Sequence, residues 1–184
     1  MQNENLTPPD EPFLSDVTAL RARARAHIEQ GPVTEDYPLE PERAVSILNI
    51  ALATELVCVL RYRLHYFMAS GVHASSVARE FLVHSNEELS HADLLAERIV
   101  QLGGEPNFAP DTLSAQSHAE YLRAHTLQDM IRENLVAERI AVESYREMIM
   151  YFGEDDPTTR NLLEDILAVE EKHADELRDL LAPN

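Results

Sequence analysis

The sequence is poor in several residue types, and each scarcity limits what the protein can be. Its 184 residues include one lysine, one cysteine, no tryptophan and five glycines. The single cysteine, Cys58, cannot form an internal disulfide, and no uninterrupted apolar run approaches the length of a membrane-spanning helix. No basic segment followed by an apolar one, the pattern of a secretion signal, stands at the N-terminus. We therefore expect a soluble, cytoplasmic protein without a membrane partner.

Positive charge is also scarce. The sequence has 33 acidic and 15 basic residues, which gives a formal net charge of −18 at pH 7. Such a charge repels nucleic acid and attracts cations. DNA binding is therefore not expected at ordinary salt concentrations.

The composition favours helices. Leu, Ala, Glu and Arg are abundant and glycine is rare, so we expect an all-α fold. Residues 1–14 are polar and contain prolines, which predicts a flexible arm. A short helix is predicted after Ser15 as its cap, with a stop at Gly31. We divide the chain into an N-terminal arm with a short helix at 1–40 and a helical domain at 41–184.

Four longer helices, each of about 25 to 30 residues, are predicted in the second part. They cover 41–70, 75–102, 126–152 and 157 to near the C-terminus. Short connections within the first pair and within the second pair are typical of antiparallel hairpins. More than twenty residues separate the two pairs, with a small helix predicted at about 113–123. This is the pattern of a four-helix bundle with one long crossover.

Four glutamates lie on the apolar faces of these helices instead of the solvent side. Most residues three, four and seven positions from each are apolar, and the four are Glu55, Glu88, Glu138 and Glu170. A carboxylate in a dry core either takes up a proton or binds a cation. We expect no inward lysine or arginine at matching positions, so the sequence indicates metal ions. Oxygen and imidazole ligands suit Fe, Mn and Zn.

Two of these glutamates are followed by a histidine three residues later. Glu88 and His91 lie in EELSHAD, and Glu170 and His173 lie in EEKHADE. Residues at this spacing share a helix face, so each pair can bind one ion. However, 22 glutamates and eight histidines in 184 residues give about one such pair by chance. The motifs alone are weak, and purely structural carboxylates are the competing interpretation.

The intervals between the glutamates are more specific than the motifs. Glu55 precedes Glu88 by 33 residues, and Glu138 precedes Glu170 by 32. In a hairpin with nearly equal arms, each pair then lies at one level of the bundle. The two halves look like repeats of one hairpin, and together they predict a dinuclear metal site at mid-bundle.

Four stretches resemble the helices of bacterioferritin and related ferritin-like proteins. They are TELVCVLRYRLHYF, EELSHADLLAERIVQLGGEPNF, ENLVAERIAVESYREMI and LLEDILAVEEKHADEL. The resemblance covers about residues 44–181. It implies a ferritin-like bundle that binds two iron ions per subunit. The implied terminal ligands are Glu55 and Glu138, the bridging carboxylates Glu88 and Glu170, and the imidazole ligands His91 and His173.

Three further residues near these positions have two interpretations each. Tyr62 matches a tyrosine one turn beyond the site, where it could form a hydrogen bond or donate an electron, or it could simply be core. His84 could support the site or an ion path, or could be a hydrogen-bonded core histidine. Cys58 could have a redox role, but it is more simply read as a small core residue.

The sequence departs from bacterioferritin in three places. Leu89 stands where bacterioferritin has its haem-ligating methionine, so haem is not expected. The sequence ends eleven residues after His173, so we expect no fifth C-terminal helix. Together with the small crossover helix, this resembles the twelve-subunit mini-ferritins, although their usual site lies between subunits. The N-terminal forty residues have no counterpart.

The leading hypothesis is an iron storage and detoxification protein with ferroxidase activity. It would oxidise Fe(II) with O2 or H2O2 at an intrasubunit di-iron site and store the mineral in a homo-oligomeric shell, with 12 subunits favoured over 24. The alternative is a di-iron or di-manganese oxidase, or a peroxide-consuming enzyme, that stores nothing.

Overall fold

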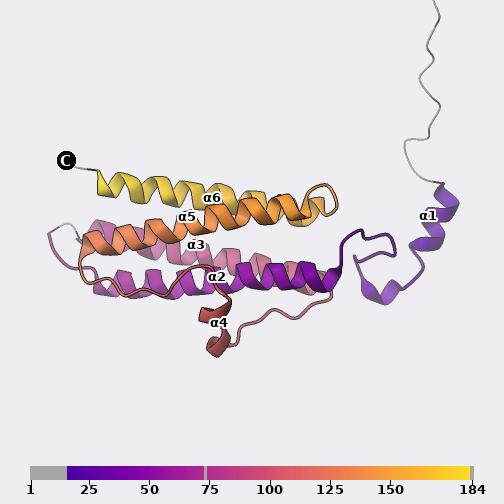
Figure 1. The fold of residues 1–184 in the computed structure, drawn as a ribbon, viewed down its shortest axis with the longest axis horizontal. Helices are drawn as coiled ribbons and strands as arrows, with labels where there is room; N and C mark the ends of the chain where they lie inside the picture. Colours follow the sequence, from indigo (N-terminus) through magenta and orange to yellow (C-terminus); the bar gives the residue numbers. More distant parts are fainter. Residues whose placement is uncertain (1–15, 73, 183–184) are drawn as a thin grey trace, which may run out of the picture.

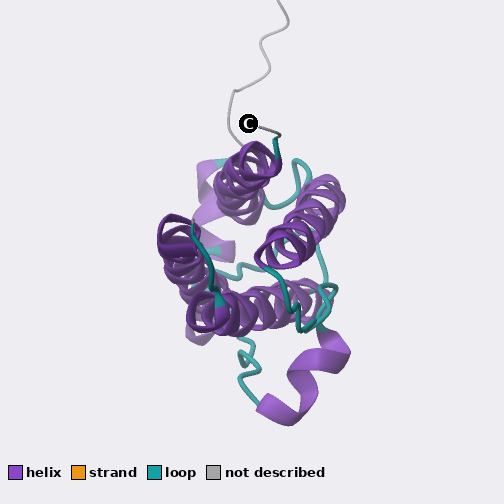
Figure 2. Ribbon diagram, turned by 90° about the vertical axis from the view of Figure 1, so that its left-hand side faces the viewer, coloured by secondary structure: helices purple, strands orange, loops and turns teal. Residues whose placement is uncertain are grey.

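The computed structural model describes residues 16–72 and 74–182, and every regular element within them is helical. Four long helices form a bundle: α2 (Pro41–Met68), α3 (Ala74–Gln101), α5 (Leu127–Phe152) and α6 (Pro157–Leu181). Figures 1 and 2 show them from the side and from one end. The predicted all-α bundle is confirmed, with helix bounds within a few residues of those expected.

The chain order gives two hairpins joined by a long crossover. α2 packs mainly on α3 and α5 mainly on α6, while α2 also contacts α5 and α3 contacts α6. The crossover returns along the bundle, so α3 and α5 run in the same direction (Figure 1). Its small helix, α4, spans Pro110–Gln116 and not the predicted 113–123. Pro110 fits the first turn of a helix, whereas Ser117 is extended and ends it.

The N-terminal segment lies beyond the end of the bundle where α2 begins (Figure 1). It contains α1 (Val17–Arg23), which has no buried residue, and the short 3-10 helix η1 (Ile28–Gln30). The cap of α1 is Asp16, which accepts a hydrogen bond from the Thr18 amide, and not the predicted Ser15. Ser15 and the predicted arm at 1–14 lie outside the described residues.

A buried polar cluster fastens the segment before α2 to the start of α6. Asp156 caps α6 by accepting a hydrogen bond from the Thr159 amide. The same carboxylate accepts bonds from Arg98 at 3.0 Å and from the Tyr37 hydroxyl at 2.8 Å. Tyr37, with Val33 and Leu39, packs against the bundle core. The bundle end nearest α1 is therefore held by one shared carboxylate.

The apolar core is divided into two main clusters along the bundle. One contains Leu52, Leu95, Ala141 and Ile166, and the other contains Cys58, Phe81, Ala137 and Leu177. Each long helix contributes to both clusters. The four inward glutamates lie in the sequence between these contributions, so they form a polar layer between two apolar ones.

α2 is long and apolar enough to cross a membrane by length and composition alone. In the structure 56% of its most apolar window is buried, and the helix makes extensive contacts with α3. Its hydropathy is accounted for by a core position in the bundle.

Candidate metal centre

Each bundle helix places one of the predicted glutamates in the polar layer at mid-bundle. Glu55 is 2% exposed, and Glu88, Glu138 and Glu170 are each 1% exposed. The two predicted histidines are buried with them, His91 at 5% and His173 at 0%. The structure thus brings all six side chains together from four helices.

The first group of potential ligands surrounds His91. Its Nδ1 atom lies 2.9 Å from Glu170 Oε1, 3.2 Å from Glu88 Oε2 and 3.5 Å from Glu55 Oε2. The donor atoms of these four residues all lie within 4.8 Å of one another. Three carboxylates and one imidazole can therefore converge on one cation.

The second group surrounds His173. Its Nδ1 atom lies 3.4 Å from Glu88 Oε1 and 3.8 Å from oxygens of both Glu138 and Glu170. These four residues also form a set within 4.8 Å. Glu88 and Glu170 belong to both groups, whereas Glu55 and Glu138 belong to one group each. Glu88 and Glu170 could therefore be shared by two cations, with Glu55 and Glu138 each serving one of them.

Two buried tyrosines connect the halves of the site. Tyr62 of α2 donates a hydrogen bond to Glu138 of α5, and Tyr145 of α5 donates one to Glu55 of α2. Each tyrosine follows the glutamate of its own helix by seven residues and binds the glutamate of the other helix. The sequence reasoning selected Tyr62 and missed Tyr145. The equal seven-residue interval in the two halves was the signal that could have found it.

Glu87 is one position away from Glu88, so its side chain is expected to face the cavity or solvent. In the structure it instead bonds to His173. Its Oε2 lies 2.6 Å from Nε2 of His173. Burial disfavours a charged Glu87, but the hydrogen bond from His173 keeps the pKa of Glu87 below its ordinary value. A charged carboxylate can only accept, so Nε2 of His173 carries the proton. The Nδ1 atom of a neutral His173 is then a bare lone pair that faces the carboxylates.

Arginine side chains do not neutralise this layer. Two arginines are buried in the bundle, Arg61 at 2% exposure and Arg98 at 8%. Arg61 donates to the side-chain oxygen of Asn134 and to the carbonyl of Glu120, and Arg98 pairs with Asp156. Neither guanidinium makes a hydrogen bond or ion pair with the four central glutamates.

Without metal, the centre is expected to hold protons. Burial is the main cause that raises the pKa of Glu88 and Glu138 well above the usual range. Burial, with repulsion from Glu88 and Glu55, raises the pKa of Glu170 to about 8. Burial alone would lower the pKa of His91, but contacts with the carboxylates raise it to about 12. For Glu55, contacts led by His91 outweigh burial and lower the pKa.

Several buried atoms in the layer have no hydrogen-bond partner. They include Glu88 Oε1, Glu138 Oε2 and His173 Nδ1. Buried polar atoms are rarely left unpaired, because the desolvation cost is about 1–3 kcal/mol for each group. The residues that carry these unpaired atoms belong to the two groups described above. The donor set therefore fits divalent transition metals, which bind carboxylate oxygen and imidazole nitrogen.

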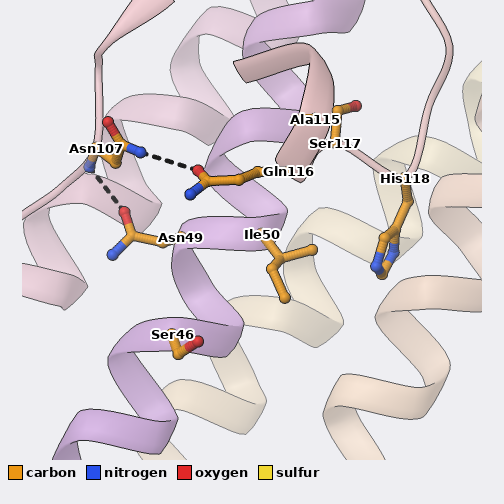
Figure 3. Close-up of a pocket in the computed structure, with 8 residues that line it drawn as sticks. All are labelled: Ser46, Asn49, Ile50, Asn107, Ala115, Gln116, Ser117 and His118. Carbon is orange, nitrogen blue, oxygen red and sulfur yellow. Dashed lines mark hydrogen bonds between the residues drawn. The ribbon is translucent and has the colours of Figure 1, made fainter. Parts of the chain in front are cut away.

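A surface cleft of about 600 Å³ lies away from this centre, between α2 and the crossover. Figure 3 shows neutral polar side chains in it, including Asn107, whose amide groups bond to Asn49 and Gln116. None of the six candidate ligands lines the cleft.

The structure is a helical bundle in which carboxylates and histidines of one chain meet in two groups that could each hold a metal ion. The chain belongs to the ferritin-like family, because the model of the ferritin-like domain matches residues 45–183. A bacterioferritin from Rhodobacter capsulatus is 32% identical over 65 residues, which are 35% of this chain and 40% of that protein. The match thus spans less than half of the bacterioferritin.

Solved structures agree with this family. A dodecameric thioferritin, the bacterioferritin-related protein from Bacteroides fragilis, is 30% identical with a TM-score of 0.75, over 78% of this chain and 86% of that chain. Dps from Thermosynechococcus elongatus has a TM-score of 0.75 at 21% identity, over 78% and 92% of the two chains, and shows the fold alone. Membership of this family supports iron binding and storage in general terms.

The tyrosine pair gives a symmetric prediction. Replacing Tyr62 or Tyr145 with phenylalanine removes a hydrogen bond that orients Glu138 or Glu55, and each change should weaken divalent-metal affinity by about 10–100-fold. Titration with Co(II) would measure this. Tyr66→Phe, which alters a partly exposed ring one turn further along α2, should have no effect. If both site variants bind Co(II) like the unaltered protein, the tyrosines are only core residues.

The proton content of the metal-free centre predicts that metal binding releases protons. Glu88, Glu138, Glu170 and His91 all have raised pKa values, so a metal must displace protons that they hold at neutral pH. Affinity should therefore increase from pH 6 to pH 8. Calorimetry in buffers of different ionisation enthalpy would count the released protons. Binding without proton release would contradict the assigned charge of the centre.

Proposed function

We propose that the protein is a ferroxidase that stores iron. Two Fe(II) ions bind per chain, at Glu55, Glu88, His91, Glu138, Glu170 and His173. O2 or H2O2 is the oxidant, and the Fe(III) product is stored as mineral inside a homo-oligomeric shell of twelve subunits in the cytoplasm. The supporting observation is the pair of four-residue groups that share Glu88 and Glu170 within one chain.

The side chains divide the work of holding two ions. Glu88 and Glu170 reach both positions, so they fix the ions close together, and a pair of Fe(II) ions can supply two electrons to one oxidant molecule. Tyr62 and Tyr145 hold the end carboxylates in place. Glu87 holds His173 in the tautomer that presents Nδ1 to the ion, a common arrangement for metal-binding histidines.

The surface supports both the supply of iron and the assembly of a shell. A net charge of −18 attracts Fe(II) and disfavours DNA. Large apolar side chains are exposed on the bundle helices, among them Phe67 at 77%, Met150 at 75% and Val100 at 60%. Exposed apolar surface of this kind marks protein–protein contacts. The related thioferritin is described as dodecameric, which supports twelve subunits here.

Rapid mixing of the metal-free protein with Fe(II) and O2, and separately with H2O2, tests this proposal when particle mass is measured on the same sample. We expect a large assembly that oxidises Fe(II) and retains many more than two irons per chain. Glu88→Ala removes a shared carboxylate and should abolish the fast oxidation. The matched control is Glu97→Gln, which removes an exposed carboxylate from the same helix.

Two results would separate the parts of the proposal. A monomer or dimer that consumes peroxide but retains no more than two irons per chain would refute storage and favour the non-storage enzyme. Fast oxidation that survives in Glu88→Ala would refute the site.

A further inference from the structure

A second cluster of potential metal ligands lies beside the two-cation centre, between α3 and α6. Nε2 of His84 is 3.1 Å from Glu176 Oε2 and 3.6 Å from Glu80 Oε1. The donor atoms of these three residues all lie within 4.8 Å of one another. His84 is fully buried, whereas the side chains of Glu80 and Glu176 are 38% and 34% exposed. The cluster therefore extends from the protein interior to the surface.

The hydrogen bonds of His84 fix which of its nitrogens carries the proton. The hydroxyl of Tyr62 has one hydrogen, and it donates that hydrogen to Glu138. At the 3.2 Å contact between His84 Nδ1 and the Tyr62 hydroxyl, the oxygen must then accept. Nδ1 of His84 is therefore the protonated nitrogen. In the neutral ring Nε2 is a bare lone pair, and it points at two carboxylates.

This arrangement places three acceptors together with no hydrogen between them. A lone pair on Nε2 cannot donate to a carboxylate, and the three donor atoms lie close enough together to bind one cation. A divalent metal satisfies the lone pair and both carboxylates together.

The neighbouring charges on both helices leave this position open to a cation. Lys172 of α6 lies 3.5 Å from Glu176 Oε1 and 3.8 Å from Glu87 Oε1. It therefore contacts the oxygen of Glu176 that faces away from His84. Glu87 of α3 bonds to His173 and adds a further carboxylate nearby.

We propose that Glu80, His84 and Glu176 form a third divalent-cation site, which adjoins the two-cation centre because His84 also has a donor atom within 4.8 Å of Glu138 and His173. It holds an Fe(II) ion near the surface, and the stacked rings of His84 and His173 lie between this ion and the two-cation centre. The existence of the site rests on its own three residues. Its role in supplying Fe(II) rests on the proposed function.

Anaerobic titration of the metal-free protein with Zn(II) tests the site. The unaltered protein should bind three ions per chain, and the double variant Glu80→Gln/Glu176→Gln should bind two, because the weakened site loses at least about tenfold in affinity. The matched control is Glu97→Gln/Asp165→Asn, which removes two exposed acidic charges from the same two helices and should keep all three ions. If the double variant binds as many ions as the control, the third site does not exist.

Glu88→Ala distinguishes this proposal from the proposed function. It should lose ions from the two-cation centre and keep the ion that requires Glu80 and Glu176. If Glu88→Ala loses no ion while the double variant still loses one, the third site stands and the two-cation centre fails.

The supply role has its own kinetic test. The double variant should oxidise Fe(II) more slowly than the unaltered protein at low Fe(II) concentration and at the same rate at saturating Fe(II). An unchanged rate at low Fe(II) would refute that role alone.

Discussion

The burial of four carboxylates between two apolar clusters is the constraint on which the rest of the structure depends. In an apolar interior an uncompensated charged carboxylate is strongly disfavoured, and the two buried arginines bind elsewhere. The layer must therefore contain protons or metal ions. Glu88 Oε1, Glu138 Oε2 and His173 Nδ1 have no hydrogen-bond partner, and their residues belong to a group that could hold a metal ion. In the proposed function, metal binding would displace the protons of this layer.

The two halves of the centre follow the two hairpins of the fold. Each hairpin gives one glutamate from its first helix and a glutamate and histidine from its second. The tyrosine bonds cross between hairpins, from Tyr62 to Glu138 and from Tyr145 to Glu55, and so couple the position of each end carboxylate to the packing of the other hairpin. Each histidine lies close to three of the central glutamates through Nδ1, and His173 is also bonded to Glu87 through Nε2.

Periodicity and spacing were enough to predict the four helices and the six side chains that meet, because helical repeats determine which residues share a face. Their role as metal ligands stays a prediction. Contacts between helices were harder to foresee. The burial of Arg61 depends on Asn134 and on a crossover carbonyl, and the Glu87–His173 bond spans α3 and α6. The small crossover helix was misplaced because its bounds follow from Pro110 and from local packing.

The central claim is that two metal ions bind within one chain between Glu88 and Glu170. Anomalous diffraction from crystals loaded anaerobically with Fe(II) tests it most directly. The structure predicts two peaks in this layer of each chain, about 3.5–4 Å apart, with the six candidate side chains around them. A layer with a single peak or none, or iron bound only between subunits, would contradict it.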